Sequence, residues 1–352
     1  MDLLKLLSNT PGVSGHEDAV QKIVWDELKP ICDEVWRDSI GNVFGLKKAT
    51  KHTGDKAPTK LMFSAHADEI GFMVKFIDSN GFIKFTPLGG FDPRILMSLR
   101  VLIHGKKVMK GLIAPVVNSI EAGKKMAFVD NALQISDYYI DLGLPREEII
   151  KYISVGDIIS FEQEFGFLNE KVVTGRNFDD RLGTYCMIEA MRRMGDTEVD
   201  IYAVSSVQEE LGVRGAETAA YTVDPDIGIA IDGSLSHDVP WAEDFQRTGV
   251  MGDGTGIYLI DNRTLGNPKL VKFLFDLASK YDVKCQKNIG GGTDASAIQR
   301  KRKGALCTTI GAPTRYMHST VQLAHIDDLE ATIKLLQYSG EHAHEIDLYN
   351  GF

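Results

Sequence analysis

Hydrophobic positions form two patterns along the chain. Short apolar runs alternate with stretches in which apolar residues have helical spacing. Short, nearly continuous apolar runs are typical of buried strands. They predict strands at residues 60–65, 200–207, 226–231 and 306–310. Apolar positions three and four residues apart are typical of amphipathic helices. They predict helices at residues 179–194, 268–281 and 327–343. This alternation predicts an α/β fold.

The N-terminal part of the chain carries a helix-start signal. Ser14 and Glu17 have the spacing of a capping box, in which two side chains satisfy free backbone N–H groups at the helix start. The apolar residues that follow have helical spacing up to about Pro30. We therefore predict a helix that begins at Ser14, followed by a hairpin over residues 34–47 around Gly41 and Asn42.

The pattern changes between residues 70 and 162, where short strand-like runs separated by turns replace the alternation. Residues 71–78 and 82–86 flank a Ser-Asn-Gly turn, which is a hairpin signal. We interpret residues 70–162 as a small β-rich domain inserted into a larger domain made of residues 1–69 and 163–352.

Composition and charge narrow the possible functions. The 352 residues are 43% hydrophobic and 25% charged, as in a globular protein with a substantial core. The net charge of -10 argues against nucleic acid or an anionic membrane as a main partner. We see no uninterrupted apolar run of membrane-spanning length and no signal peptide, and the four cysteines are widely separated. These features favour a cytoplasmic enzyme with reduced, buried thiols.

Candidate metal ligands stand where the predicted strands end. His66, the pair Glu209 and Glu210, and Asp232 each directly follow an apolar run, and His318 follows one after a short loop. Sites in α/β sheets form at the carboxyl ends of strands, so these side chains are expected to meet. Any one of them alone is more often structural, but the set as a whole favours a site.

Two imidazoles and three carboxylates are what a pair of divalent ions such as zinc requires, and a hydrolase needs one further carboxylate as a base. Asp179 opens a predicted helix, and either it or Asp180 could bridge two ions. Asp68, two residues after His66, is placed to orient that imidazole. The glycine-rich loop at residues 290–294 could approach a substrate, although it lacks the sequence of a phosphate-binding P-loop.

Five sequence motifs resemble those of one enzyme family. They are AHADEIG at residues 65–71, NFDDR at 177–181, VQEELGVRG at 207–215, GTDA at 292–295 and RYMHS at 315–319. In order and in content they are similar to the tetrahedral (TET-type) aminopeptidases, the co-catalytic zinc metallopeptidases that include glutamyl aminopeptidases and proteins once labelled endoglucanases or cellulase M. The resemblance runs along essentially the whole chain.

The resemblance implies a zinc-exopeptidase fold, a three-layer α/β/α sandwich with an inserted β-barrel-like domain that mediates dimerisation and assembly up to a dodecamer. It implies two divalent ions, zinc first, with cobalt or manganese as alternatives. His66 and Asp232 would hold one ion, Glu210 and His318 the other, and Asp179 would bridge them. Glu209 would be the general base that activates water against the first peptide bond, and Asp68 the partner of His66. The implied substrates are short peptides that lose their N-terminal residue.

Other functions remain open from the sequence. A metal-dependent deacylase or carboxypeptidase would use a similar ligand set. A glycosidase, as some relatives' labels suggest, would need two carboxylates but usually no transition metal. A non-catalytic assembly protein would not need an intact ligand set. Arg315 could pair with an acidic substrate side chain or could have a structural role.

Overall fold

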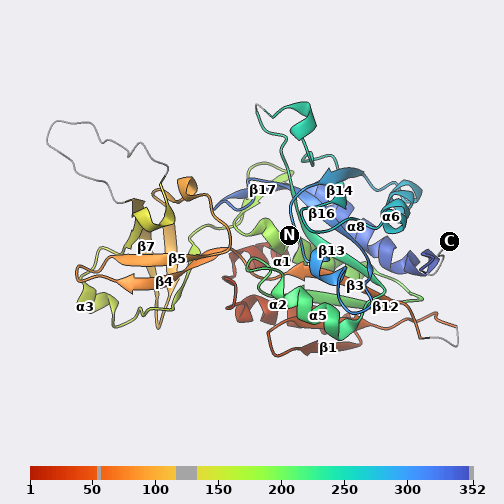
Figure 1. The fold of residues 1–352 in the computed structure, drawn as a ribbon, viewed down its shortest axis with the longest axis horizontal. Helices are drawn as coiled ribbons and strands as arrows, with labels where there is room; N and C mark the ends of the chain where they lie inside the picture. Colours follow the sequence, from red (N-terminus) through yellow and green to blue (C-terminus); the bar gives the residue numbers. More distant parts are fainter. Residues whose placement is uncertain (54–56, 116–132, 241, 349–352) are drawn as a thin grey trace.

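The computed structural model describes residues 1–53, 57–115, 133–240 and 242–348. Figure 1 shows an α/β body with a smaller β-barrel at one end of the molecule. The body is built on an 11-stranded mixed sheet, and the barrel is closed by six strands. Among the described residues, no helix has the length and apolar character needed to cross a bilayer.

The body contains all strands outside the barrel and most of the helices. Its strands are β1 (Glu34–Arg37), β2 (Val43–Lys47), β3 (Lys60–His66), β10 (Gly166–Phe167), β11 (Val172–Gly175), β12 (Asp200–Ser206), β13 (Ile227–Leu235), β14 (Thr255–Ile260), β15 (Cys285–Ile289), β16 (Leu306–Arg315) and β17 (Gln322–His325). Its helices are α1 (Asp2–Asn9), α2 (Asp18–Leu28), α4 (Phe178–Arg193), α5 (Arg214–Val223), α6 (Pro268–Lys280), α7 (Ala295–Ile298) and α8 (Ile326–His342).

The centre of the sheet is parallel. Strand β3 lies between β12 and β13, and β13 pairs in turn with β16, all in the same direction. Ser206 at the end of β12 is in register with His66 at the end of β3. The carboxyl ends of these strands therefore meet at one edge of the sheet, as expected for an α/β site.

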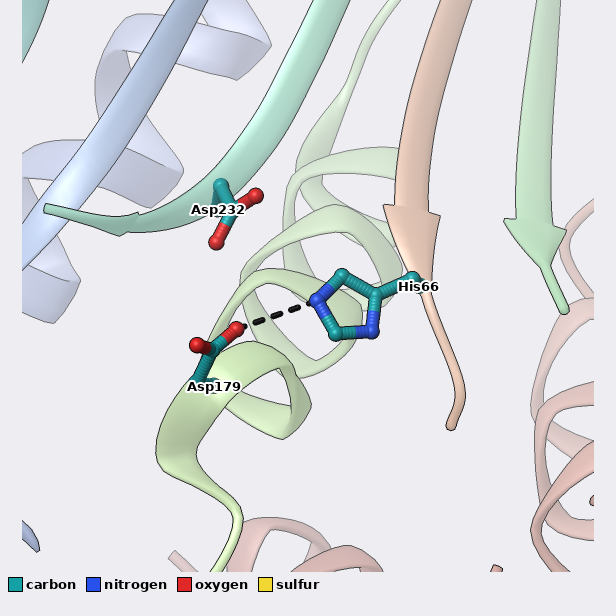
Figure 2. A group of neighbouring side chains, drawn as sticks. All are labelled: His66, Asp179 and Asp232. Carbon is teal, nitrogen blue, oxygen red and sulfur yellow. Dashed lines mark hydrogen bonds and ion pairs between the residues drawn. The ribbon is translucent and has the colours of Figure 1, made fainter. Parts of the chain in front are cut away.

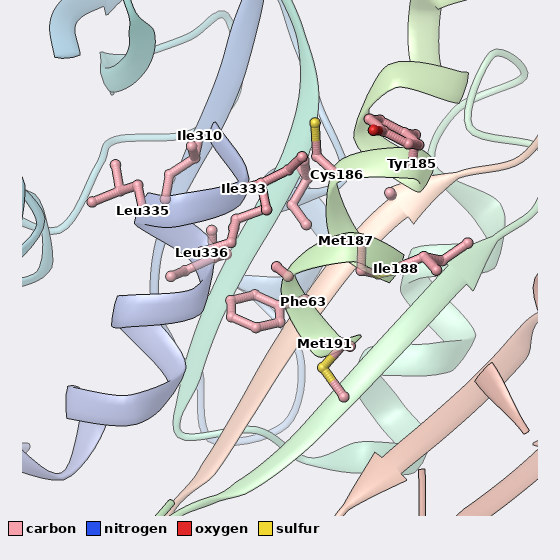
Figure 3. Close-up of a cluster of buried hydrophobic side chains, with 14 of the residues drawn as sticks. Phe63, Tyr185, Cys186, Met187, Ile188, Met191, Ile310, Ile333, Leu335 and Leu336 are labelled. Atoms are coloured by element: carbon pink, nitrogen blue, oxygen red, sulfur yellow. The ribbon is translucent and has the colours of Figure 1, made fainter. Parts of the chain in front are cut away.

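Helices cover both faces of this sheet and make three layers. In β3, Leu61 and Phe63 belong to the larger hydrophobic cluster, which the strands share with α1, α2, α4, α6 and α8. Figure 3 shows part of this cluster, with Phe63 among side chains of α4 and α8. Met62, between them, faces the other side, where α5 and α7 pack. Side chains alternate along a strand, so a continuous apolar run serves two cores at once. Burial of a side chain such as Phe63 contributes about 1.5–3 kcal/mol.

The inserted barrel closes in the order β4, β5, β8, β7, β6, β9. Its strands are β4 (Gly71–Ile77), β5 (Ile83–Leu88), β6 (Arg100–His104), β7 (Val108–Pro115), β8 (Tyr138–Asp141) and β9 (Ile158–Phe161), and it carries helix α3 (Arg146–Ile149). It has its own core, in which the ring of Phe72 contacts those of Phe85, Phe91 and Phe161. All six strands fall within the predicted insertion of residues 70–162, of which residues 116–132 lie outside the described part of the chain.

The predicted start of helix α2 is wrong. Helix α2 begins at Asp18, not at Ser14, and its N-cap Glu17 makes no side-chain capping bond. Ser14 instead donates to Asp68, and the Glu17 carboxylate accepts from the backbone N–H of Gln208. The capping-box spacing is present, but Ser14 binds a residue far away in the sequence, and Glu17 accepts both from the nearby N–H of Gly15 at 2.7 Å and from that of Gln208 at 3.1 Å.

Strand β13 differs from its prediction as well. It does not end before Asp232 but continues to Leu235, paired with β16 along its whole length. The polar sequence Asp-Gly-Ser was interpreted as a strand end, but Ser234 is buried and donates to the carbonyl of Gly311. Asp232 therefore projects from inside a strand rather than from the loop after one.

Candidate metal centre and catalytic cleft

Asp179 lies between two histidines that come from distant parts of the chain. Its Oδ1 is 3.0 Å from Nε2 of His66, and its Oδ2 is 3.2 Å from Nε2 of His318. Figure 2 shows the first of these contacts, with Asp232 approaching from β13. Each carboxylate oxygen thus faces a different imidazole, which is the arrangement of a bridging carboxylate.

The same residues form two overlapping groups of potential metal ligands. One group is His66, Asp179 and Asp232, and the other is Asp179, Glu210 and His318. Within each group, one ligand-type atom per residue lies within 4.8 Å of the others. Asp179 belongs to both groups. The structure therefore brings together all five side chains that the sequence singled out.

Both imidazoles are oriented by main-chain carbonyls on the side away from the site. Nδ1 of His66 is 3.1 Å from the carbonyl oxygen of Asp68, and Nδ1 of His318 is 3.1 Å from that of Gly90. A carbonyl oxygen only accepts, so Nδ1 must be the donor in each case. In the neutral form each ring then offers the lone pair of Nε2 toward Asp179, as a metal ligand does.

Asp68 is fully buried and organises the glutamate pair as well as His66. One carboxylate oxygen lies 3.4 Å from Nδ1 of His66. The backbone N–H groups of Glu209 and Glu210 donate to the two oxygens at 2.9 and 3.2 Å, and the Ser14 hydroxyl donates at 2.6 Å. A carboxylate with this many donors is fixed in place and holds the loop after β12 against the end of β3.

The backbone turns sharply just before the glutamate pair. Gln208 has a φ of 55°, in the left-handed region that costs a non-glycine residue of order 1 kcal/mol. The carbonyl of Glu209 then accepts from the N–H of Gly212 at 2.7 Å, closing a turn. As a result Glu209 and Glu210 line the same cavity instead of pointing to opposite faces of a strand.

The N-terminal end of α4 also departs from regular structure. Asp179 and Asp180 have non-helical dihedral angles, and the peptide bond between them is cis. Helix α4 agrees with the predicted helix of residues 179–194 within one residue at each end, but its regular part begins only after Asp180. Asp180 belongs to neither group of potential ligands and accepts from the backbone N–H groups of His66 at 3.0 Å and Gly183 at 2.9 Å.

Burial and charge crowding shift the protonation of the cluster. Burial raises the pKa of Glu209, Asp232 and, to about 7, of Glu210. Hydrogen bonding to Asp179 raises the pKa of His318 to about 10, against the effect of burial. Burial acts to raise the pKa of Asp179, but its bonds to His318 and His66 outweigh it and lower that pKa.

These shifts have one common cause. Without a cation, several buried carboxylates repel one another, so either protons or protonated histidines must neutralise them. Divalent cations would do the same, and the nitrogen and oxygen donors of this set suit zinc and similar ions. The residues present therefore fit a two-metal centre.

The cleft beside this cluster has a volume of about 310 Å³. Its titratable lining residues with shifted pKa values or metal-ligand chemistry are Asp179, Glu209, Glu210, Asp232 and His318. The rest of its lining, the uncharged wall, consists of Gly233, Leu235, Tyr258, Gly291, Gly292, Thr293 and Met317. The glycine-rich loop predicted to approach a substrate thus lines the cleft.

Several of these lining residues could not be recognised from the sequence. Leu235 and Tyr258 lie in ordinary strand patterns, and only the tertiary fold brings them to the cleft. From the sequence, Arg315 could bind a substrate or have a structural role. In the structure its guanidinium pairs with a carboxylate of the protein itself. Its Nε donates to Asp238 at 2.7 Å and a second guanidinium nitrogen contacts the other carboxylate oxygen. This bidentate pair favours the structural role.

The inserted barrel reaches the same site through the residues that follow β5. Gly90 supplies the carbonyl that orients His318. An added Cβ at Gly89 would lie 3.3 Å from the Glu210 carboxylate and 2.5 Å from Ile70. The barrel is therefore not remote from the candidate centre but packs on its edge.

A polar cluster at the carboxyl ends of central parallel strands, beside a cleft, is the usual architecture of a binding or catalytic site in an α/β fold. The chain belongs to the M42 glutamyl aminopeptidase family, whose model matches residues 41–335. This membership identifies it as a peptide hydrolase. The lysyl aminopeptidase of Pyrococcus furiosus is 35% identical to it over 349 residues, which are 95% of this chain and 94% of the relative.

Solved structures agree with this assignment. An aminopeptidase from the archaeon Desulfurococcus kamchatkensis superposes with a TM-score of 0.92 at 32% identity, covering 100% of this chain and 97% of that one. The TET1 peptidase of Pyrococcus horikoshii superposes with a TM-score of 0.82 at 28% identity over 96% and 98% of the two chains. That peptidase can assemble into a tetrahedron or a large octahedral shell. The predicted TET-type fold, with its closed barrel, is confirmed.

Proposed function

We propose that the protein is a metal-dependent aminopeptidase that removes N-terminal residues from short peptides, with two divalent ions held by the cluster around Asp179. The observation that carries this proposal is the double contact of Asp179, one oxygen toward each histidine. In the proposed centre His66 and Asp232 hold one ion, Glu210 and His318 hold the other, and Asp179 bridges them. Zinc suits these donors, with cobalt or manganese as alternatives.

Bound at this position, the ions would polarise the carbonyl of the first peptide bond and make an attacking water more acidic. Glu209 is the proposed general base. It lines the cleft but belongs to neither ligand group, so its carboxylate is free of the ligand role. Glu209 takes a proton from the attacking water and then delivers it to the leaving amine. Asp68 positions it by accepting from its backbone N–H at 2.9 Å.

The uncharged wall of the cleft supports a preference for neutral, apolar N-terminal residues. Leu235, Tyr258 and Met317 offer apolar surface. Tyr258 is 3% exposed, and its hydroxyl donates to the carbonyl of Gly233 at 3.3 Å, so it presents its ring rather than a free polar group. The Arg315 side chain is paired with Asp238, which leaves it poorly placed to attract an acidic first residue.

We further propose that the barrel is the assembly domain, in homo-oligomers from a dimer to a dodecamer. Several large apolar side chains are exposed on it, including Phe76 at 57% and Val155 at 66%. Contiguous exposed apolar surface is typical of interfaces. The assembly of the similar TET1 peptidase supports this role. The unpaired cysteines agree with the predicted cytoplasmic location.

A panel of chromogenic substrates tests the proposed activity. Leucyl, lysyl, glutamyl and aspartyl p-nitroanilides are compared before and after chelation, with zinc, cobalt or manganese added back. We expect chelator-sensitive hydrolysis, fastest for leucine. N-acylated amino acids test for a deacylase, and cellulose tests for a glycosidase. Hydrolysis of acylated but not free-amino substrates would select the deacylase, and chelator-resistant cleavage of cellulose would select the glycosidase.

A further inference from the structure

A second hollow of about 240 Å³ adjoins the cleft. The two hollows share Glu209, Glu210 and the glycine-rich loop at residues 291–293. The second one is completed by Gly212, Val213, Asn262, Arg263 and Ser296. It touches none of His318, Asp179 and Asp232. The glutamate pair and this loop therefore form the boundary between a hollow that contains most of the candidate ligands and one that contains Glu210 alone of them.

Arg263 gives this second hollow its chemical character. Among the described residues that line it, Arg263 alone carries a positive charge. Its side chain is exposed and makes no ion pair with any described residue. In a chain with net charge -10, other arginines such as Arg315 and Arg37 pair with carboxylates. An arginine without an internal partner at a site wall is available to bind an anionic group.

The loop that carries Arg263 is held in a fixed shape against the cleft. The Asp261 carboxylate accepts from the N–H groups of Arg263 at 2.6 Å and Thr264 at 2.5 Å. The N–H of Asn262 donates to the carbonyl of Gly291 at 3.0 Å. Arg263 is thus presented by a formed turn that is bonded to the loop shared by both hollows, so little ordering is needed when a ligand binds.

The wall of the hollow also contains an unsatisfied polar group. Ser296 is fully buried, and its hydroxyl has no hydrogen-bond partner among the described residues. Gly292, in the shared loop, has no atom within 4 Å of the position that a Cβ would take. Buried polar groups are normally satisfied, so a polar occupant or an ordered water is expected here. The open space at Gly292 lets a peptide backbone approach.

The position of Glu209 indicates which part of a peptide enters this hollow. If Glu209 delivers a proton to the leaving amine, it stands at the boundary between the first residue and the rest of the substrate. The apolar wall of the first hollow suits the side chain of the first residue. The second hollow, on the other side of the glutamates, then receives the part of the peptide that leaves.

We propose that Arg263 binds a carboxylate on the leaving part of the peptide and so directs the enzyme toward short peptides that present an anionic group there. This inference depends on the proposed aminopeptidase function. The carboxylate can be the free C-terminus of a dipeptide or an acidic side chain at the second position. Arg263 is in this sense a specificity-determining residue and takes no part in the bond cleavage.

Four substrates distinguish the two sources of the carboxylate. Leu-Gly is compared with Leu-Gly-amide for the C-terminus, and Leu-Asp-amide with Leu-Asn-amide for the side chain, all with the metal-loaded full-length protein. We expect the wild type to favour the anionic member of at least one pair by about two- to fivefold in kcat/KM, the size of a solvent-exposed charge pair. The effect should lie in KM and should decrease as salt is added.

Variants test whether Arg263 causes this preference. Arg263→Gln should bring the ratio within the pair toward one, and Arg263→Lys should retain part of it. Arg192→Gln removes an exposed arginine of helix α4 outside both hollows and should leave the ratio as in the wild type. Equal rates within both pairs for the wild type, or a preference that survives in Arg263→Gln, would overturn the inference.

The test separates failure of the inference from failure of the proposed function. No hydrolysis of any of the four peptides by metal-loaded protein would refute the aminopeptidase proposal itself. Hydrolysis of all four without discrimination would refute only the role of Arg263. A loss in Arg263→Gln that is confined to glutamyl-amide substrates would show that the hollow takes the first side chain, and would also overturn the inference.

Discussion

The carbonyl oxygen of Gly90 lies 3.1 Å from Nδ1 of His318, although the two residues are 228 positions apart in the sequence. Gly90 belongs to the barrel and His318 to the loop after β16. Through this contact the inserted domain fixes the tautomer and direction of a proposed metal ligand. The barrel therefore has a role in the site that does not depend on any role in assembly.

The neighbouring Gly89 tests this connection between barrel and site. Gly89→Ala would place a Cβ 2.5 Å from Ile70 at a φ of 90°, so both contact and strain disfavour it. We expect weaker metal binding and lower activity. Gly156→Ala is the matched control, since it has a similar φ of 98° in the same barrel but nothing within 4 Å of its Cβ. Metal titration and kcat/KM should change in the first variant only, and equal effects in both would contradict the argument.

Glu209→Gln tests the proposed base. The amide keeps the shape of the side chain but cannot take a proton, so we expect kcat to fall by about a hundredfold to ten-thousandfold. Metal content, measured by mass spectrometry, should stay at the wild-type level because Glu209 belongs to neither ligand group. Glu210→Gln is the comparison and should lose metal as well. A Glu209→Gln enzyme with near-normal turnover would remove Glu209 from the mechanism.

Asp179→Asn tests whether Asp179, rather than its neighbour Asp180, bridges the two ions. The substitution removes the negative charge and replaces one carboxylate oxygen by an NH2 group, so Asp179 can no longer offer an oxygen to each ion. We expect the metal content to fall from about two ions per chain to below one. Asp180→Asn should keep its metal, since Asp180 bonds to backbone N–H groups and belongs to neither ligand group. Its effect should be on thermal stability. Metal loss in the Asp180 variant alone would reverse the assignment.

The pKa shifts predict that metal binding releases protons. His318, with its pKa raised to about 10, is protonated at neutral pH, and a metal can bind only the neutral ring. Glu210, with its pKa raised to about 7, gains a proton as the pH falls through that value. Metal affinity should therefore decrease from about pH 8 to about pH 6. Calorimetry of the metal-free protein in buffers of different ionisation enthalpy measures the released protons, and heats independent of the buffer would contradict the prediction.

Much of the site could be predicted from local patterns. His66 and the glutamate pair stand out because each follows an apolar run, and the parallel order of β12, β3 and β13 then brings the strand ends to one edge. The fold class follows from the same alternation. These features depend on periodicity within a few residues, which is visible in one sequence without any knowledge of distant contacts.

Other features depend on contacts between distant residues and left no local sign. Gly90 and Tyr258 look like ordinary barrel and strand residues. Ser14 and Glu17 have the local signature of a cap, yet Ser14 donates to Asp68 and the Glu17 carboxylate accepts from Gln208 as well as from its neighbour Gly15. Short polar strands such as β17 were missed because their pairing, not their composition, makes them strands.

Leu235 provides the test of the substrate preference. It lines the cleft as part of the uncharged wall and is the last residue of β13. Leu235→Asp removes apolar surface and adds a negative charge, so we expect kcat/KM for a leucyl substrate to fall about tenfold or more, with a relative gain for a lysyl one. Leu265→Asp is the control, because Leu265 is 63% exposed and does not line the cleft. If the leucyl-to-lysyl ratio changed equally in both variants, the first side chain would have to bind elsewhere.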